Sequence, residues 1–362
     1  MYLKSINLLN FKNYEEAELS FSSKINCFVG NNGVGKTNLL DAIHYLSMSK
    51  SYFNTVDSQN IQHNKDFFVI QGFFEKDGEE EEIYCGIKRN KRKQFKRNKK
   101  EYQKLSEHIG LLPIVMISPA DNSLILEGSE ERRKFINAVI SQYDRHYLAD
   151  TISYNRTLAQ RNILLKYFNK SRKFDAASLE VWDEQLIPLA ERIFKSRQEF
   201  TKRLMPIFQK YYDFISKGNE KVALTYQSQL HDTDFRELLN SALPKDRVLE
   251  YTTVGIHKDD LSLKLGDNPI KKIGSQGQQK TYLVALKLAK FDFIKEVDSF
   301  NPILLLDDIF DKFDHERVKQ IIQLVADDNF GQIFITDTDQ ERWDNILKEL
   351  KIEHNIYKIP LG

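Results

Sequence analysis

The residue types best suited to chemistry form one segment near the N-terminus, between an apolar run at 25–29 and a helical pattern at 39–48. Its residues are Gly30, Asn31, Asn32, Gly33, Val34, Gly35, Lys36 and Thr37. The segment matches the phosphate-binding pattern GxxxxGK followed by Ser or Thr at every fixed position, and a strand before it and a helix after it are the context that this chemistry requires. Glycines let the backbone wrap around phosphate oxygens, while successive N–H groups and the helix N-terminus attract the anion. We expect Lys36 to contact the β- and γ-phosphates of ATP and to assist catalysis, and the Thr37 hydroxyl to bind Mg²⁺.

A pair of carboxylates forms the second candidate group. The apolar run at 303–306 is followed by Asp307 and Asp308, as in a buried parallel strand whose C-terminal end carries acidic side chains into a site. Asp307 suits the coordination shell of Mg²⁺, usually through a water molecule. Asp308 is placed to orient or deprotonate an attacking water. Such a run can also be an ordinary capped strand end, but the P-loop upstream favours the catalytic interpretation.

A third segment separates the classes of P-loop protein. The sequence GSQGQQK at 274–280 comes just before a helical pattern at 282–294, about 30 residues ahead of the carboxylates. It resembles the signature motif of ABC-type ATPases, which in that class covers the γ-phosphate bound by a partner subunit. A helix N-terminus would again face an anion, with Ser275 donating a hydrogen bond, Gly277 allowing close approach and Gln278 beside them. A simple Gly/Ser helix cap is the alternative, and the order of the motifs favours the signature.

Other positions of that class are less well matched. Asp314 lies where the class has a loop that faces the partner subunit, although the residues around it depart from the usual pattern. Residues 336–339 (TDTD) stand at the position of the switch histidine of the class, and they contain no histidine. No glutamine is assigned to the Q-loop of the class, since Gln71 lies in a strand-like run and is expected to be an ordinary strand residue.

The elements that must position these groups follow from the hydrophobic pattern. Residues 1–40 alternate as strands around the P-loop, and further strand-like runs occur at 67–75, 83–89 and 111–118. From about 129 to 217 the pattern is helical, with Pro188 and Pro206 expected to kink the helices or restart them.

At Gly255 the strand pattern returns. We therefore predict an α/β fold in which residues 1–125 and 250–362 form an ABC-type ATPase head, with a mixed sheet and surrounding helices. A helical second lobe at 126–249 is inserted into it, without a long coiled coil.

Composition bounds the class of protein. The chain has 362 residues, of which 41% are apolar, so one large or two medium domains are expected. Its formal net charge is +1, so a nucleic-acid surface would have to be local. The two cysteines, Cys27 and Cys85, lie in apolar runs without metal-ligand spacing, and we expect them to be buried, reduced thiols of a cytoplasmic protein. We expect neither a signal peptide nor a membrane-spanning helix.

One local feature is suited to nucleic acid. The segment KRNKRKQFKRNKK at 88–100 holds nine Lys or Arg and no acid, enough to neutralise several phosphates. The candidate DNA contacts are Arg92, Lys93, Lys96 and Arg97. The alternative is a solvated hairpin whose charge is balanced by the acids at 79–82. Sequence-specific readout is not expected, because nothing resembles a recognition helix.

With these motifs in place, the chain resembles the bacterial RecF family along nearly its whole length. The segment 9–47 is similar to the first lobe of that family. The segments ISPAD at 117–121, EG at 127–128 and ERRKF at 131–135 are similar to the stretch that joins its lobes. TVGIHKDD at 253–260 matches its Gly-Pro-His-Arg-Asp-Asp pattern with two substitutions, Ile256 and Lys258.

The resemblance implies an ATPase head, a helical second lobe and a homodimer that forms on ATP. It further implies weak, DNA-stimulated ATP hydrolysis, with binding to single-stranded DNA and to gapped or junction duplexes regardless of sequence. The family acts in recombinational repair, replication-gap processing and the SOS response, together with the RecO and RecR mediators that load recombinase. The helical insertion is far too short for the coiled coils of SMC-like relatives.

Three other functions remain open. An ATPase subunit of an ABC-type transporter would associate with membranes, and the SQGQQ form of the signature, the helical insertion and the basic segment stand against it. A small-molecule P-loop kinase would need no signature motif and no dimer. A nucleotide-gated clamp would use ATP to control assembly without appreciable turnover.

Overall fold

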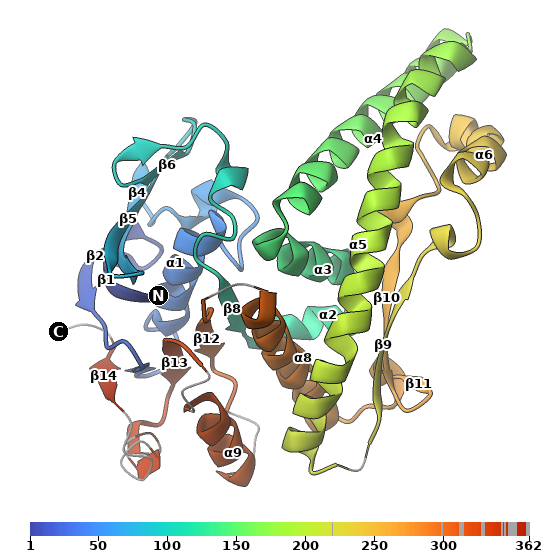
Figure 1. Ribbon diagram of the computed structural model, residues 1–362. Coiled ribbons are helices and arrows are strands. Elements are labelled where there is room, and N and C mark those ends of the chain that lie inside the picture. The colour runs from blue at the N-terminus through green and yellow to red at the C-terminus, as the bar shows by residue number, and fades with distance from the viewer. Residues whose placement is uncertain are drawn as a thin grey trace. The chain divides into compact units, whose positions relative to one another are not determined.

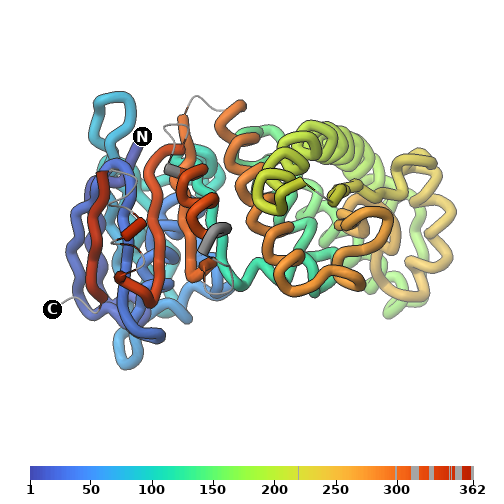
Figure 2. Tube along the Cα trace, turned by 90° about the horizontal axis from the view of Figure 1, so that it is seen from below, coloured from blue at the N-terminus to red at the C-terminus, as the bar shows by residue number. Residues whose placement is uncertain are grey.

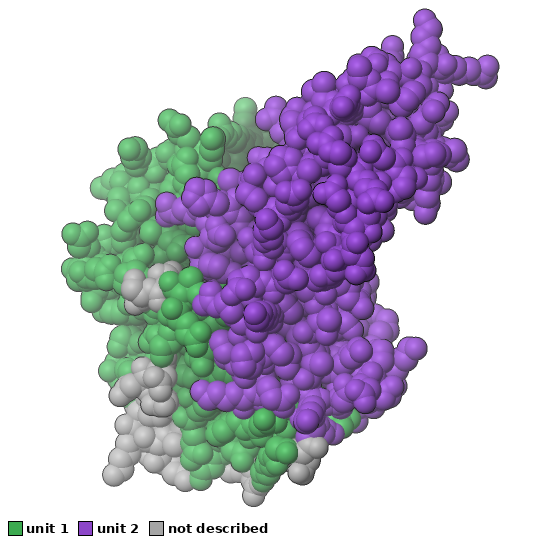
Figure 3. Space-filling view, turned by 45° about the vertical axis from the view of Figure 1, so that its right-hand side comes forward, with its two compact units in different colours: residues 1–122, 211–218, 276–362 green, residues 123–210, 219–275 purple. Residues whose placement is uncertain are grey.

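The structure is a computed structural model that describes all residues except 219, 298–299, 311–314, 327–329, 342, 344, 347–352 and 360–362. The chain divides into two units, which are coloured separately in Figure 3. Unit 1 comprises Met1–Asn122, Tyr211–Gly218 and Gln276–Gly362, and unit 2 comprises Ser123–Lys210 and Asn219–Ser275.

A parallel sheet in unit 1 carries the P-loop and the carboxylates (Figure 1). Its strand order is β14-β3-β13-β12-β8, with β3 (Ile25–Val29), β8 (Ile114–Ile117), β12 (Ile303–Asp307), β13 (Ile333–Asp337) and β14 (His354–Lys358). Segments from the two ends of the chain therefore lie side by side, as the blue and red strands in Figure 2 show. β3, β8, β12 and β13 are buried along their whole length, which explains their continuous apolar runs. Because parallel strands end at one edge of a sheet, the residues that follow β3, β12 and β13 meet there.

An antiparallel sheet forms the other layer of unit 1. Its order is β2-β1-β4-β5-β6-β7, with β1 (Tyr2–Phe11), β2 (Tyr14–Ser20), β4 (Phe67–Lys76), β5 (Glu79–Lys88), β6 (Gln94–Arg97) and β7 (Lys100–Glu101). The P-loop helix α1 (Lys36–Met48) shares one hydrophobic core with both sheets, through apolar residues that include Leu39, Ile43 and Leu46. Unit 1 also contains α8 (Gln276–Val297), α9 (His315–Ala326) and the short helices η1 (Asp57–Asn60), η2 (Leu105–Glu107) and η3 (Pro119–Asn122).

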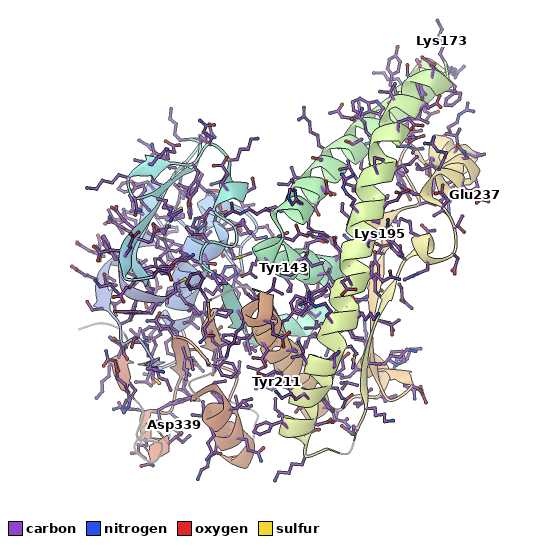
Figure 4. The ribbon with its side chains drawn as sticks, in the orientation of Figure 1. Tyr143, Lys173, Lys195, Tyr211, Glu237 and Asp339 are labelled. Atoms are coloured by element: carbon purple, nitrogen blue, oxygen red, sulfur yellow. The ribbon has the colours of Figure 1, made fainter. Side chains whose placement is uncertain are left out.

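Unit 2 combines helices with a small sheet. Its helices are α2 (Ser123–Leu126), α3 (Ser129–Tyr143), α4 (Arg145–Ser171), most of α5 (Ala176–Ser216), α6 (Phe235–Leu249), α7 (Ile270–Ile273), η4 (Gln229–His231) and η5 (Ile256–Lys258). The sheet has the order β11-β10-β9, with β9 (Val222–Gln227), β10 (Asp260–Leu265) and β11 (Asn268–Pro269). Lys173 marks the turn between α4 and α5 in Figure 4.

The helical stretch predicted from 129 to 217 is divided into α3, α4 and α5. Asp144 caps the start of α4 by accepting the N–H of Tyr147 (2.9 Å). Neither Pro188 nor Pro206 restarts α5, which continues through both. Each proline removes one helical N–H donor, while α5 carries buried apolar residues along its length, such as Leu186 and Phe208.

The two units divide the chain at positions that differ from the predicted lobes. Residues 250–275, which we expected in the ATPase head, belong to unit 2. The reason is the pairing of β10 with β9, which runs in register from Asp260↔Gln227 to Leu265↔Val222. Unit 2 therefore contains a sheet as well as helices. In the part of the chain that the structure describes, no helix has both the length and the apolar character needed to cross a membrane.

Candidate nucleotide-binding site

The P-loop occupies the turn between β3 and α1, as its sequence context predicts. Gly30 donates its N–H to the carbonyl oxygen of Asp337 at the end of β13 (3.3 Å). A Cβ on Gly30 would lie 2.1 Å from the carbonyl oxygen of Ile359. Gly35 has a φ of 111°, and a Cβ there would lie 2.3 Å from the side-chain amide of Asn13. Neither position has room for a side chain, so both glycines are required for the tight turn that leads into α1.

The Lys36 side chain folds back over this loop and is largely buried. Its ammonium group donates to the carbonyl oxygens of Gly30 and Asn31, at 2.8 Å each. Burial lowers the pKa of Lys36, while the charges of Asp308 and Asp307 act in the opposite direction. A cation is thus held at the N-terminus of α1, where the helix dipole already favours an anion.

Three hydroxyl groups surround the Asp307 carboxylate at the end of β12. Thr37 Oγ1 and Thr336 Oγ1 both donate to Oδ1, at 2.8 and 2.9 Å, and Ser118 Oγ donates to Oδ2 at 3.2 Å. Asp307 is 3% exposed. Its burial raises the pKa of the carboxyl, and the three hydrogen bonds act against this rise. The structure therefore brings Thr37 and Asp307, the two residues predicted to bind Mg²⁺, into direct contact.

Asp308 follows in an unusual backbone conformation. Its φ is 49°, in the left-handed region that non-glycine residues adopt uncommonly and that Asp and Asn tolerate best. Its N–H donates to Thr336 Oγ1 (3.0 Å). Its charge affects the pKa of Lys36 more strongly than that of Asp307 does.

The turn between β1 and β2 supports the P-loop in a way that the sequence did not predict. Asn13 Nδ2 donates to the carbonyl oxygen of Val34 (2.9 Å), and Asn13 Oδ1 accepts from Asn38 Nδ2 (2.7 Å). Tyr14 donates its hydroxyl to the carbonyl oxygen of Gly35 (3.1 Å). The only available signal was a polar turn between two strand-like runs, and no motif spacing connects it to the P-loop.

The predicted signature residues form a second group, at the start of α8. Ser275 is exposed and directly precedes the helix, and Gly277 and Gln278 lie in its first turn. The division between the units falls here, with Ser275 in unit 2 and Gly277 and Gln278 in unit 1. The role of this group toward a nucleotide stays a prediction. Asp314 lies outside the described residues.

The segment at the position of the switch histidine, which Asp339 marks in Figure 4, follows β13. The Asp337 carboxylate accepts the N–H groups of Thr338 (2.6 Å) and Asp339 (3.0 Å) and so holds the turn after the strand. Gln71 lies within β4 and donates to Glu82 on β5 (2.7 Å), as expected of an ordinary strand residue.

The fold uses two of the four predicted DNA contacts in ion pairs. Lys93 pairs with Asp57 (2.8 Å), and Arg97 pairs with Glu81 on the adjacent strand β5. Lys96 lies over the ring of Tyr84, 5.2 Å from its centroid. Of the acids at 79–82 that were expected to balance the charge of this segment, Glu81 forms an ion pair with Arg97.

The turns at the ends of β5 and β6 expose a different set of cations. We call this set the exposed cation group, and it consists of Lys88, Arg89, Lys91, Arg92, Lys99 and Lys100. Of the four predicted contacts, only Arg92 belongs to it.

Residues 253–260 contribute to the interior of unit 2. Asp260 accepts two hydrogen bonds from Arg132 of α3, at 2.6 Å from Nε and 3.0 Å from Nη2. Asp259 accepts from Arg197 of α5 (2.8 Å), and both of these groups are buried. This segment thus ties the start of β10 to two helices of unit 2.

Fold and site together define the class of this protein. A parallel sheet with a P-loop after one strand, two carboxylates after another and a signature-type segment at a helix start is the arrangement of an ABC-type ATPase head, the class that includes the SMC proteins. The family model described as "RecF/RecN/SMC N terminal domain" matches residues 2–357.

Comparison with individual proteins narrows this class. The chain is 54% identical to the DNA replication and repair protein RecF of Bacteroides thetaiotaomicron, across 100% of this chain and 98% of that protein. It is 50% identical to the protein of the same name from Flavobacterium johnsoniae, across 99% of each. The chain belongs to the RecF family.

Solved structures agree with this membership. The structure of the recombination mediator protein RecF with ATP, of the RecFOR pathway, is similar with a TM-score of 0.89 and 31% identity, across 99% of this chain and 95% of that one. An Smc head bound to the C-terminal winged-helix domain of ScpA has a TM-score of 0.57 at 16% identity, across 96% of this chain and 92% of that one, and so shares the fold. Membership of the RecF family excludes the transporter subunit considered above.

Proposed function

We propose that the chain is a cytoplasmic, ATP-dependent DNA-binding protein of recombinational repair and replication-gap processing, which hydrolyses ATP slowly. The observation that carries the ATPase part is the contact between Thr37 Oγ1 and Asp307 Oδ1 (2.8 Å) next to a P-loop that anchors Lys36. The repair part rests on the named relatives, which are DNA replication and repair proteins.

The donor set suits Mg²⁺ held together with a nucleotide. Mg²⁺ prefers oxygen ligands and is usually held by one or two protein groups plus phosphate oxygens and waters. The Thr37 hydroxyl and the Asp307 carboxylate supply two such groups in contact. Among the described residues no cluster of three or more His, Cys, Asp or Glu could hold a metal alone.

The roles of the residues follow from their positions. Lys36 and the N-terminus of α1 would bind the β- and γ-phosphates of ATP, and Thr37 and Asp307 would hold Mg²⁺. Mg²⁺ held there would supply positive charge that offsets the negative charge of the phosphates and of the departing ADP. The Asp308 carboxylate orients a water molecule toward the γ-phosphorus and accepts its proton as the new P–O bond forms.

Hydrolysis in this class requires two chains. The segment that contains Ser275, Gly277 and Gln278 would close over the γ-phosphate bound by a second copy, so that ATP and not ADP supports a homodimer. Support comes from its place at the N-terminus of the long helix α8, where backbone N–H groups attract an anion.

DNA would be bound through its phosphates, by the exposed cation group and by the predicted contacts Arg92, Lys93, Lys96 and Arg97. Such contacts are independent of base sequence and suit single strands as well as gapped and junction duplexes. The ATP-bound RecF structure is that of a recombination mediator protein of the RecFOR pathway. We infer by analogy that RecO and RecR mediators are the protein partners.

The test is the mass of the protein in solution with ATP, with ADP and without nucleotide, each with and without gapped duplex DNA. We expect a dimer with ATP and a monomer otherwise, with DNA-stimulated phosphate release. A monomer in every condition, or metabolite-dependent turnover unaffected by DNA, would instead indicate a small-molecule kinase. ATP-dependent dimers without phosphate release would indicate a nucleotide-gated clamp.

A further inference from the structure

Thr336 connects the two carboxylates of the site. It lies near the end of β13 and is fully buried (0% exposed). In the parallel pairing of β12 with β13 its register partner is Asp307. Its hydroxyl donates to Asp307 Oδ1 (2.9 Å) and accepts the N–H of Asp308 (3.0 Å). One side chain thus contacts the metal-side carboxylate and the backbone of the residue assigned to the water.

The Thr336 hydroxyl acts as a donor toward Asp307 and as an acceptor toward Asp308. A hydroxyl has one proton to donate and lone pairs with which to accept. Because the carboxylate of Asp307 accepts the proton of Thr336, a lone pair is directed to the N–H of Asp308. Asp308 has a left-handed backbone, at φ 49°, a conformation that aspartate tolerates better than most residues and that local hydrogen bonds can hold.

We propose that Thr336 is a positioning residue for ATP hydrolysis, whose hydroxyl holds Asp308 in its left-handed conformation and so directs the Asp308 carboxylate at the attacking water. This role rests on the ATPase function proposed above. It also gives a role to residues 336–339, which stand at the position of the switch histidine of the class and contain no histidine.

Ser118 provides a comparison at the same carboxylate. Its hydroxyl also donates to Asp307, at Oδ2 (3.2 Å), but from the end of β8 on the other side of β12. Removal of the Ser118 hydroxyl takes a hydrogen bond from Asp307 without touching the N–H of Asp308. If positioning of Asp308 is what matters, loss of the Thr336 hydroxyl lowers the turnover rate more than loss of the Ser118 hydroxyl does.

The experiment separates the loss of the hydroxyl from the loss of side-chain volume. Thr336→Val removes the hydroxyl, and Thr336→Ser retains it. Thr201→Val is the matched control, since Thr201 is also buried and its hydroxyl donates within α5, to the carbonyl oxygen of Arg197 (2.8 Å). For each variant we would measure kcat, KM, equilibrium binding of a fluorescent ATP analogue and the thermal unfolding midpoint.

We expect Thr336→Val to bind the analogue as the parent does and to lose about tenfold to hundredfold in kcat, because small misplacements of a reacting group have effects of this size. Thr336→Ser should recover most of the rate, Ser118→Ala should lose less, and Thr201→Val should keep parental activity. A Thr336→Val protein with unchanged kcat would overturn the proposal. So would a loss of analogue binding that parallels the loss of rate, since that pattern indicates a general structural role.

A double-variant cycle tests the route through Asp308. If Thr336 acts by positioning Asp308, Thr336→Val adds little to the loss already caused by Asp308→Asn, because the carboxylate to be positioned is gone. Fully multiplicative losses would contradict that route. Failure of the proposed function is a distinct result, since the parent chain itself would then show no ATP turnover, and the positioning role would fall with it.

Discussion

At the scale of single residues, the two carboxylates of the site have different surroundings, and these surroundings suit different tasks. Asp307 is buried and accepts hydrogen bonds from three hydroxyl groups, which fix it in place as a metal ligand should be fixed. Asp308 is less buried and has a left-handed backbone, and its charge raises the pKa of Lys36 against the effect of burial. A carboxylate in that position is able to approach a water molecule and take its proton.

The assignment of Asp308 predicts a specific kinetic defect. Asp308→Asn keeps the volume of the side chain but replaces the carboxylate with an amide that cannot accept the proton. We expect near-normal ATP affinity and a loss of turnover of about a hundredfold or more. Lys36→Met is the contrasting variant, because it removes the cation from the phosphate site and should weaken ATP binding itself. Full activity of Asp308→Asn in a phosphate-release assay would contradict the assignment.

The sequence predicts the site residues that belong to linear motifs and misses those that meet only in the fold. Thr37 and Asp307 are 270 residues apart, yet each carries its own signal, the P-loop and the acidic end of an apolar strand. Ser118 and Thr336 are single hydroxyl residues at the ends of other strands. Their role depends on the order β13-β12-β8, a long-range pairing that local patterns do not encode.

At the scale of elements, a strong hydrophobic periodicity predicts helices well, whereas the pairing of strands that are distant in the sequence cannot be predicted from local patterns. The apolar face of α1 and the helix that follows the signature segment lie where the pattern predicts them. The sequence pattern of β10 is typical of a strand, but it does not show which strand pairs with it. The pairing with β9, which follows the long helix α5, is what places β10 in unit 2. The places where helices end were also hard to predict. Asp144 caps the start of α4, whereas Pro188 and Pro206 lie inside α5 without interrupting it.

We predict that the exposed cations in the turns that flank β6 contribute to the affinity for DNA. Changing Lys88, Arg89, Lys91 and Arg92 to Ala should weaken binding to duplexes of unrelated sequence by similar factors. The slope of log affinity against log salt should flatten by about 0.9 per lost phosphate contact. ATP hydrolysis without DNA should be unchanged.

A matched control for this prediction comes from the same segment. Lys93 and Arg97 are already paired with Asp57 and Glu81, so Lys93→Ala with Arg97→Ala should change the salt slope less. An unaltered slope in the four-residue variant would mean that these turns are only a solvated hairpin.

At the scale of the whole molecule, buried histidines make folding stability depend on pH. Burial lowers the pKa of His44, His108 and His257 to about 4 each. In the unfolded chain a histidine has a pKa of about 6.5, so between pH 6.5 and 4 the unfolded state binds protons that the folded state does not. The stabilisation present above this window is therefore lost as the pH falls through it.

We expect each of these histidines to lower the free energy of unfolding by about 1 kcal/mol between pH 6 and pH 5. Urea unfolding of the parent and of His108→Gln at both pH values measures the contribution of one of them. The difference between the two pH values should be smaller in the variant, because glutamine does not titrate. An equal pH dependence in the two proteins would contradict a neutral, buried His108.

The last prediction concerns assembly, because a complete site is proposed to need two chains. The P-loop of one chain supplies most contacts that an isolated subunit makes to ATP, so the segment around Ser275 should add little to binding in the monomer. In the dimer it would meet the γ-phosphate of the facing chain. Ser275→Arg places a long side chain where two surfaces and a phosphate must meet, and steric exclusion there should outweigh attraction to the phosphate. We therefore expect Ser275→Arg to bind ATP with near-normal affinity, to stay monomeric where the parent dimerises and to lose hydrolysis.

Mixing Ser275→Arg chains with Lys36→Met chains should restore at most one working site per dimer, formed by the intact P-loop of one chain and the intact signature segment of the other. Light scattering that shows normal ATP-dependent dimers of Ser275→Arg would refute a role for this segment in trans.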